Sequence, residues 1–268
     1  MPVTIIDTHA HIYPDKIARK AAASVGEFYN IPMQLDGTVA TLLQKGSEAG
    51  ITRHLVHSVA LTWERAQAIN DFIAASVAEH PDRFIGFGAM HPEHPDMEKE
   101  LDRIVSLGLR GVKIHPDTQL FHMDDPKAIR MFEAMEERKL ILLAHTGDYR
   151  YPYSAPERMA RALDHVPSLR TICAHFGGWS IWQDAWRLLA GRDHVYVDTC
   201  SSLYAISPEE AVKVIHRYGA GRVFFATDYP MWDPAEELAR FMALPLTEEE
   251  RELILHQNFE RLIGEVIA

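Results

Sequence analysis

The chain has 268 residues, 47% of them hydrophobic and 24% charged, a composition that is typical of a folded globular protein and excludes a disordered or fibrous one. Its net charge of −11 at pH 7 argues against nucleic acid and anionic membranes as partners. Its two cysteines, Cys173 and Cys200, lie in apolar stretches that look like strands, so we expect neither a disulfide framework nor a C-x-x-C metal site.

Short runs rich in β-branched residues alternate with helical patterns along the whole chain. The predicted strands are Val3–Asp7, His54–Val59, Phe84–Ala89, Arg110–His115, Leu140–His145, Thr171–His175, Val195–Thr199 and Val223–Asp228. Strands that alternate with helices predict a parallel sheet, and eight such units predict closure into a (β/α)8 TIM barrel. We therefore expect a single α/β domain over residues 1–268, with a doubly wound open sheet as the structural alternative.

The predicted helices follow the strands in turn. They are Val39–Ala49, Glu64–Glu79, Met97–Leu107, Lys127–Arg138, Ala155–Leu163, Trp182–Ala190, Pro208–Tyr218, Pro234–Ala243 and Glu248–Leu262. Thr247 and Glu250 form the pattern of a capping box at the start of the last helix. The long connection between the first two strands contains a further predicted helix near Lys16–Ala23 and an irregular stretch from Glu27 to Gly37. Long loops of this kind often build part of an active-site wall in a barrel.

Five of the predicted strands are largely apolar and then end in polar side chains. The residues at these ends are His9, His11, Lys113, His115, His145, His175 and Asp228. In a barrel the carboxyl ends of all strands meet at one face, where catalysis takes place. We therefore expect these side chains to lie close together.

His9 and His11 are spaced to bind one metal ion. Side chains two positions apart on a strand point to the same side, while Ala10 between them is expected to face the helices. Asp228 follows a mostly apolar run, and a buried carboxylate without a cation is costly; its alternative role is the N-cap of the next helix. Imidazole ligands with one carboxylate suit Zn²⁺, and also Mn²⁺, Fe²⁺, Co²⁺ or Ni²⁺.

In this order along the chain, these motifs resemble the amidohydrolase superfamily. They are similar in particular to its amidohydrolase-2 branch, which includes the aminocarboxymuconate semialdehyde decarboxylase-like enzymes. The resemblance rests on Ile6–His11, Gly111–Pro116, Ala144–Gly147, Ala174–Gly178 and Phe225–Pro230, and Ile254–Leu262 resembles the closing helix of that branch. Each motif alone is weak evidence, whereas the full set on successive strands is specific.

The resemblance implies one divalent ion, Zn²⁺ in the first instance, held by His9, His11, His145 and Asp228. His175 matches a histidine that contacts the bound water or the substrate in one-metal members of the family. In two-metal members that histidine is a ligand, and a carboxylated lysine on the fourth strand bridges the ions. Lys113 is the candidate for such a bridge, but the stretch around it looks like the amidohydrolase-2 form, so we expect a single ion.

Hydrolysis is the leading prediction for the activity. Metal-activated water would attack a small amide, ester or lactone, while Asp228 moves the proton and His175 polarises the carbonyl oxygen. The alternative is non-oxidative decarboxylation, or hydration, of a small unsaturated or aromatic carboxylic acid by the same residues. The sequence does not separate these activities.

Four residues near the strand ends are candidates for substrate binding: His115, Lys113, Arg150 and Trp179. A charged or imidazole side chain can hold a carboxylate, and a tryptophan can line an apolar pocket. A solvated loop for Arg150 and simple packing for Trp179 are the alternatives. The expected partner is a small molecule, with no nucleic acid and no membrane involved.

Two other classes of protein share parts of this pattern. A TatD-type nuclease has the same D-x-H-x-H start but uses a glutamate on the fourth strand, where this chain has Lys113 and His115. The charge of −11 also offers no basic track for nucleic acid. A barrel that only binds a ligand would be expected to lack at least one metal-ligand type, and here all are present.

The first residues show no signal-peptide pattern, and no apolar run approaches the roughly 18 residues that span a membrane. We therefore expect a cytoplasmic protein in a reducing compartment. A homodimer is the default expectation for its assembly.

Overall fold

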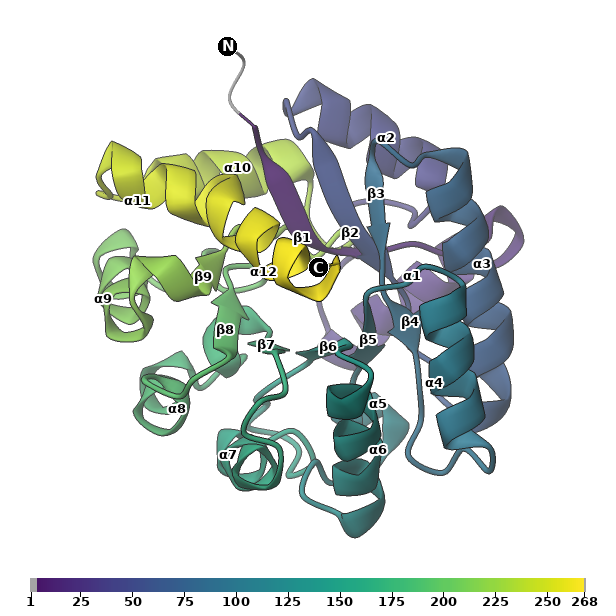
Figure 1. The fold of residues 1–268 in the computed structure, drawn as a ribbon. Helices are drawn as coiled ribbons and strands as arrows, with labels where there is room; N and C mark the ends of the chain where they lie inside the picture. Colours follow the sequence, from purple (N-terminus) through teal and green to yellow (C-terminus); the bar gives the residue numbers. More distant parts are fainter. Residues whose placement is uncertain (1–3, 268) are drawn as a thin grey trace.

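The strands of the computed structural model, which describes residues 4–267, run parallel and form a ring with helices outside it (Figure 1). They are β1 Ile6–His11, β2 Arg53–His57, β3 Phe84–Gly86, β4 Gly88–Ala89, β5 Gly111–Ile114, β6 Ile141–Ala144, β7 Thr171–Cys173, β8 Val195–Asp198 and β9 Val223–Phe224. Hydrogen bonds join β1, β2 and β3, in that order, into one sheet, and the strands from β4 through β9, in chain order, into another. β3 and β4 are the two halves of one predicted strand, divided at Phe87, whose N–H donates to Val56 O at 3.0 Å.

The ring closes between β1 and the segment that follows β9. Ala10 forms a parallel bridge with Tyr229, and the N–H of His11 donates to Tyr229 O at 2.7 Å. The N–H of Thr8 donates to Phe225 O at 3.0 Å. These bonds close the predicted barrel and rule out the doubly wound open sheet.

Helices follow the strands and pack outside the ring, apart from the first and the last helix, which lie at its two ends. They are α1 Asp15–Tyr29, α2 Val39–Glu48, α3 Ala66–Glu79, α4 Met97–Ser106, α5 Pro116–Gln119, α6 Pro126–Glu137, α7 Pro156–His165, α8 Trp182–Leu189, α9 Pro208–Tyr218, α10 Pro234–Met242, α11 Glu248–Glu252 and α12 Asn258–Ile267. Thr247 forms the predicted capping box with Glu250, and a π-helical segment joins α11 to α12. None of the helices within residues 4–267 is both long and apolar enough to cross a membrane.

The barrel interior has an apolar layer below a polar one. Alternate residues of a strand face the same side, and the inward-facing residues at the amino-terminal end of the barrel are apolar, among them Ile6, Leu55, Ile141, Ile172 and Phe224. Side chains of α12 belong to the same buried cluster, and Figure 1 shows α12 crossing in front of the strands. The polar side chains at the other end therefore lie on a closed apolar plug.

The predicted sixth and eighth strands are shorter than expected. β7 ends at Cys173 and β9 at Phe224, before the His175 and Asp228 that were predicted to end them. Both of those residues have a φ of 60°, in the left-handed region that does not continue a strand. Their side chains therefore leave the strand alternation and contact the other polar residues of the mouth.

The amino-terminal region also differs from the prediction. β1 starts at Ile6 and includes His9 and His11, whereas Val3, the predicted first residue of this strand, lies outside the described residues. α1 continues to Tyr29, through the start of the stretch predicted to be irregular. The longer helix brings its carboxyl end to the mouth of the barrel.

Asp7 is a fully buried acceptor at the barrel closure, and its replacement tests that closure. Its Oδ1 accepts the N–H groups of His9 at 3.2 Å and Thr227 at 2.9 Å. Its Oδ2 accepts the Thr227 hydroxyl at 2.8 Å and lies 3.1 Å from His54 Nδ1. Asp7→Ala leaves these donors without a partner, so we expect the free energy of unfolding to fall by about 3 to 5 kcal/mol in urea denaturation.

Asp102→Ala is the matched control, because Asp102 is largely exposed and pairs with Arg138 on the surface. This variant should lose less than about 1 kcal/mol of the free energy of unfolding. Equal losses in the two variants would contradict the role given to Asp7.

Candidate metal centre

Three of the four predicted metal ligands bring their donor atoms together. His9 Nε2 and His11 Nε2 lie 3.3 Å apart, and Asp228 Oδ1 lies 3.6 Å from the first and 3.5 Å from the second. An ion about 2.1 Å from three ligand atoms spaces those atoms about 3.0 to 3.5 Å apart. The donor atoms therefore have close to the spacing that a divalent ion requires.

β1 orients both histidines, and a carboxylate from β8 also orients His9. His9 and His11 lie on one side of β1, while Ala10 belongs to the apolar cluster that includes the helices, as predicted. The other ring nitrogen of His9, Nδ1, lies 2.9 Å from Asp198 Oδ2. A carboxylate at one imidazole nitrogen fixes the proton there and leaves the other nitrogen free to bind an ion.

Asp228 is held as a carboxylate of the site. Its Oδ2 accepts the hydroxyl of Ser201 at 2.5 Å, and that hydroxyl accepts the indole N–H of Trp232 at 2.9 Å. The N-cap of α10 is Asp233, so the alternative role of Asp228 as a helix cap is wrong. Burial raises the pKa of Asp228 to about 6, against the opposing hydrogen bond from Ser201. A bound cation would offset this loss of hydration.

The histidines of the barrel mouth are neutral. Burial is the main reason that the pKa values of His9, His11, His115 and His145 lie well below the usual value. Burial also lowers the pKa of His175 to about 4. Neutral imidazole is the form that binds metal ions, so these ligands need not lose a proton first at pH 7.

Lys113 lies in the same buried layer. Its Nζ is 3.1 Å from His9 Nε2, and only 1% of the residue is exposed. Burial lowers the pKa of Lys113 to about 8, so the amine loses its charge more readily than an exposed lysine. A charged ammonium here would repel an ion at His9, and ion binding therefore favours the neutral or displaced amine.

His145, the fourth predicted ligand, lies beside this group and bonds elsewhere. Its Nε2 is 2.8 Å from Gly147 O, and its Nδ1 is 3.0 Å from His175 Nε2. His175 Nδ1 in turn lies 3.1 Å from Cys200 O. Since the ring of His145 would have to give up one of these contacts to bind an ion, its role as a ligand stays a prediction.

The end of α1 covers the barrel mouth. Tyr29 Oη lies 2.5 Å from His115 Nε2 and 3.3 Å from His145 Nδ1. The Tyr29 ring packs edge-on against Trp179 with ring centroids 4.9 Å apart, and the His115 and His145 rings stack at 4.0 Å. Figure 1 shows α1 behind the strands, at the opposite end from α12. His115 and Trp179 thus adjoin the site, and their roles in substrate binding stay predictions.

The guanidinium of Arg150 is paired with the protein itself. It donates to both carboxylate oxygens of Asp148 at 2.7 to 3.2 Å and to Phe28 O at 2.8 Å. It also lies 5.0 Å from the ring centroid of Phe28, 5.4 Å from that of Tyr29 and 5.3 Å from that of Trp179. Arg150 therefore holds the end of α1 in place, and its predicted role in substrate binding stays a prediction.

Three residues of the site were not predicted: Asp198, His57 and Tyr29. Asp198 and His57 each end a strand that is apolar just before it, so the rule that found the other candidates applies to them as well. The length of the connection that contains Tyr29 indicated a contribution to the wall of the site, but no local pattern singled out Tyr29 itself. Cys200, expected within a strand, instead follows β8 and places its sulfur 3.3 Å from His9 Nδ1.

Comparison with known proteins identifies relatives of this chain. Residues 6–264 match the family model described as amidohydrolase. Over 207 residues the chain is 28% identical to a 2-amino-3-carboxymuconate-6-semialdehyde decarboxylase of Dictyostelium discoideum, a match that covers 62% of this chain and 56% of that protein. The match thus spans little more than half the length of that relative.

Two solved structures share the fold. A 5-carboxyvanillate decarboxylase of Sphingomonas paucimobilis is 20% identical, with a TM-score of 0.78, and the match covers 98% of this chain and 99% of that one. A dihydroxybenzoic acid decarboxylase of Polaromonas sp. JS666, solved with manganese and the inhibitor 2-nitroresorcinol, is 19% identical, with a TM-score of 0.74 and coverage of 98% and 97%. The predicted barrel fold is confirmed.

These proteins also bear on the predicted chemistry. All three are decarboxylases, the activity predicted as the alternative, and they give no support to hydrolysis, the leading prediction. The Polaromonas enzyme was solved with manganese, and none of the three proteins is described with zinc, the ion predicted in the first instance. The comparisons thus favour the alternative over the leading prediction. The sequence could not rank the two reactions, because one set of metal ligands serves both and ligand types do not encode which bond breaks.

Asp198→Asn tests whether this carboxylate aims His9. The amide fills the same space but is a weaker acceptor for a proton on Nδ1, so the affinity for Mn²⁺ or Zn²⁺ should fall roughly 10- to 100-fold. Competition with a chelating dye measures the Kd. Asp184→Asn, on the exposed face of α8, is the control and should bind as the unmodified chain does. An unchanged Kd in Asp198→Asn would show that His9 does not depend on it.

Proposed function

The chain belongs to the amidohydrolase family, and we propose that it is a metal-dependent, non-oxidative decarboxylase of a small aromatic or unsaturated carboxylic acid. The observation that carries the proposal is the convergence of donor atoms from His9, His11 and Asp228, at the spacing of a divalent ion, in a buried layer. The activities of the three named relatives support it.

We assign one divalent transition ion to His9, His11, His145 and Asp228. The spacing of three of these donors supports the assignment, and His145 completes the set after its ring turns away from His175 or Gly147. Nitrogen and carboxylate ligands accept both Zn²⁺ and Mn²⁺, and the Polaromonas decarboxylase contains manganese. When bound, the ion acts as a Lewis acid that holds and orients the oxygens of the substrate.

The reaction breaks the bond between the carboxylate carbon and the carbon that bears it. The electron pair stays on that second carbon, which takes up a proton, while the carboxylate leaves as CO2. The carboxylate therefore loses its negative charge in the reaction. Because buried surroundings solvate a carboxylate less well than water does, they make this loss of charge easier. The buried polar layer above the apolar plug provides such surroundings.

Three side chains of the mouth can serve this reaction directly. His175 donates through Nδ1 to Cys200 O, and its Nε2 can accept a hydroxyl hydrogen of the substrate once the ring of His145 has turned away from it. Lys113, whose amine is neutral or displaced from His9 when the ion is bound, donates a hydrogen bond to an oxygen of the substrate. Asp228, whose second oxygen is held by Ser201, moves the proton to the substrate carbon. In this assignment Asp228 and His175 are the catalytic residues and Lys113 binds the substrate.

Metal removal and a substrate panel test the proposal. The chain should release CO2 from at least one member of a panel of dihydroxybenzoates, 5-carboxyvanillate and carboxymuconate semialdehydes. Treatment with a chelator should reduce the rate at least about tenfold, and Mn²⁺ or Zn²⁺ should restore it. Turnover of esters, lactones or amides, with no CO2 release from any acid of the panel, would contradict decarboxylation and return hydrolysis to first place.

Asp228→Asn tests the assigned proton transfer. Since positioned acid–base groups contribute roughly 10²- to 10⁴-fold, kcat should fall by at least about 100-fold while the chain stays folded and retains some metal. Asp233→Asn is the matched control, because Asp233 caps α10 outside the site and should leave kcat unchanged. An Asp228→Asn variant that keeps most of its rate would remove Asp228 from the mechanism.

A further inference from the structure

His57 brings a third imidazole to the centre formed by His9 and His11. It is the last residue of β2 and lies in register with His11 on the neighbouring strand β1. Leu55, two residues earlier, belongs to the apolar plug inside the barrel. Since side chains two positions apart on a strand face the same way, His57 points into the polar layer above that plug.

Neither ring nitrogen of His57 has a hydrogen-bond partner among the described residues, and the residue is fully buried. Buried polar atoms in folded proteins are nearly always paired, and an unpaired one costs about 1 to 3 kcal/mol. One nitrogen of a neutral imidazole carries a lone pair that can bind a metal ion, and none of the described residues donates a hydrogen bond to it.

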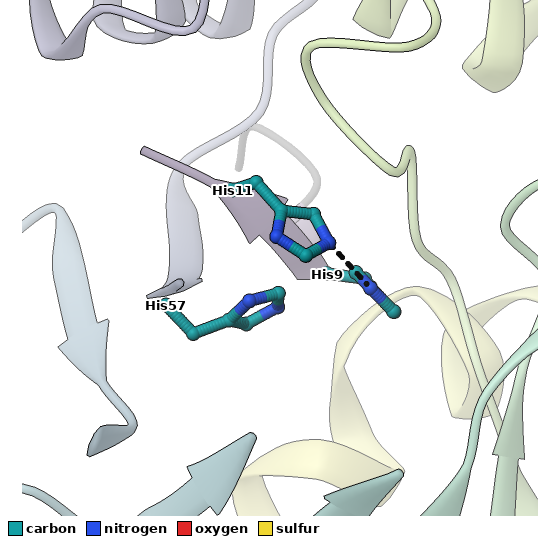
Figure 2. Close-up of side chains that lie close together, drawn as sticks. All are labelled: His9, His11 and His57. Atoms are coloured by element: carbon teal, nitrogen blue, oxygen red, sulfur yellow. Dashed lines mark hydrogen bonds between the residues drawn. The ribbon is translucent and has the colours of Figure 1, made fainter. Parts of the chain in front are cut away.

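The three rings are arranged as ligands of one ion are. The ring centroids of His9 and His57 lie 4.8 Å apart, those of His11 and His57 4.5 Å apart, and those of His9 and His11 5.2 Å apart. Imidazoles that share an ion at about 2.1 Å have ring centroids about 4.6 to 5.3 Å apart. Figure 2 shows the ring of His57 next to the rings of His9 and His11.

The donor atoms of the three residues also lie near one another. One ring nitrogen from each lies within 4.8 Å of the others. A shared ion needs separations of about 3.0 to 3.5 Å between donor atoms, and because the ring centroids already have a suitable spacing, the ring of His57 needs only to turn so that one nitrogen faces the ion. A rotation about its side-chain bonds can provide such a turn.

We infer that His57 is a further ligand of the ion held by His9, His11 and Asp228. The inference rests on the proposed metal centre and adds to it a residue that the sequence analysis did not single out. A third or fourth neutral nitrogen shifts the ligand set away from oxygen, so it strengthens binding of Zn²⁺, Co²⁺ and Ni²⁺ more than binding of Mn²⁺.

Metal titration of His57→Ala tests the inference without an activity assay. The Kd for Zn²⁺, measured by competition with a chelating dye, should rise at least about tenfold, and the Kd for Mn²⁺ should rise less. X-ray absorption of the zinc-loaded protein should count one imidazole fewer than in the unmodified chain. His122→Ala is the control, because a ring nitrogen of His122 also lacks a partner in the part of the chain that the structure describes, but His122 lies beside Tyr153, outside the site.

A Kd for Zn²⁺ and an imidazole count that both match the unmodified chain would overturn the role of His57 and leave water as the partner of its ring. If His57→Ala does not fold, as circular dichroism would show, His57→Gln fills the space and gives the same two readouts. His9→Ala separates this inference from the proposed centre, since it must lose the ion in either case. Normal binding by both His9→Ala and His57→Ala would overturn the centre itself.

Discussion

The buried carboxylate of Asp7 is the constraint on which the site depends. Oδ1 accepts the backbone N–H of His9 on β1 and that of Thr227, the residue before Asp228. One oxygen atom thus fixes two segments that are more than 200 residues apart in the chain and that carry opposing ligands. Because these hydrogen bonds also close the barrel, the geometry of the candidate metal centre and the integrity of the fold depend on the same contacts.

The division of the barrel interior into two layers explains the electrostatics of the mouth. Below the site the strands and α12 pack apolar side chains, so the polar layer has no water beneath it. In such surroundings the charged form of any side chain is penalised, which keeps the histidines neutral, lowers the pKa of Lys113 and raises that of Asp228. A divalent cation bound here would offset the cost of burying the Asp228 carboxylate and would take up free lone pairs of the histidines.

The cover over the site is built from aromatic and charged side chains acting together. Tyr29 reaches His115 and His145 through its hydroxyl, and Arg150 lies against the Tyr29 ring while Asp148 neutralises its charge. A guanidinium that is both paired and stacked is a strong positional anchor. The shape of the mouth is therefore set by α1 as much as by the strand ends that supply its chemistry.

The sequence by itself determined the order of the strands and most of the residue types at their ends. The alternation of apolar residues and the spacing of His9 and His11 on one strand are local properties, which can be recognised without knowledge of the tertiary contacts. The tertiary structure decided what those side chains face. It placed Asp198 beside His9, brought the end of α1 over the barrel and paired Arg150 with Asp148. Within residues 4–267 it also left the ring nitrogens of His57 without a hydrogen-bond partner beside His11. Each of these contacts joins segments distant in the chain, and their distances depend on barrel closure and helix packing, which no local pattern encodes.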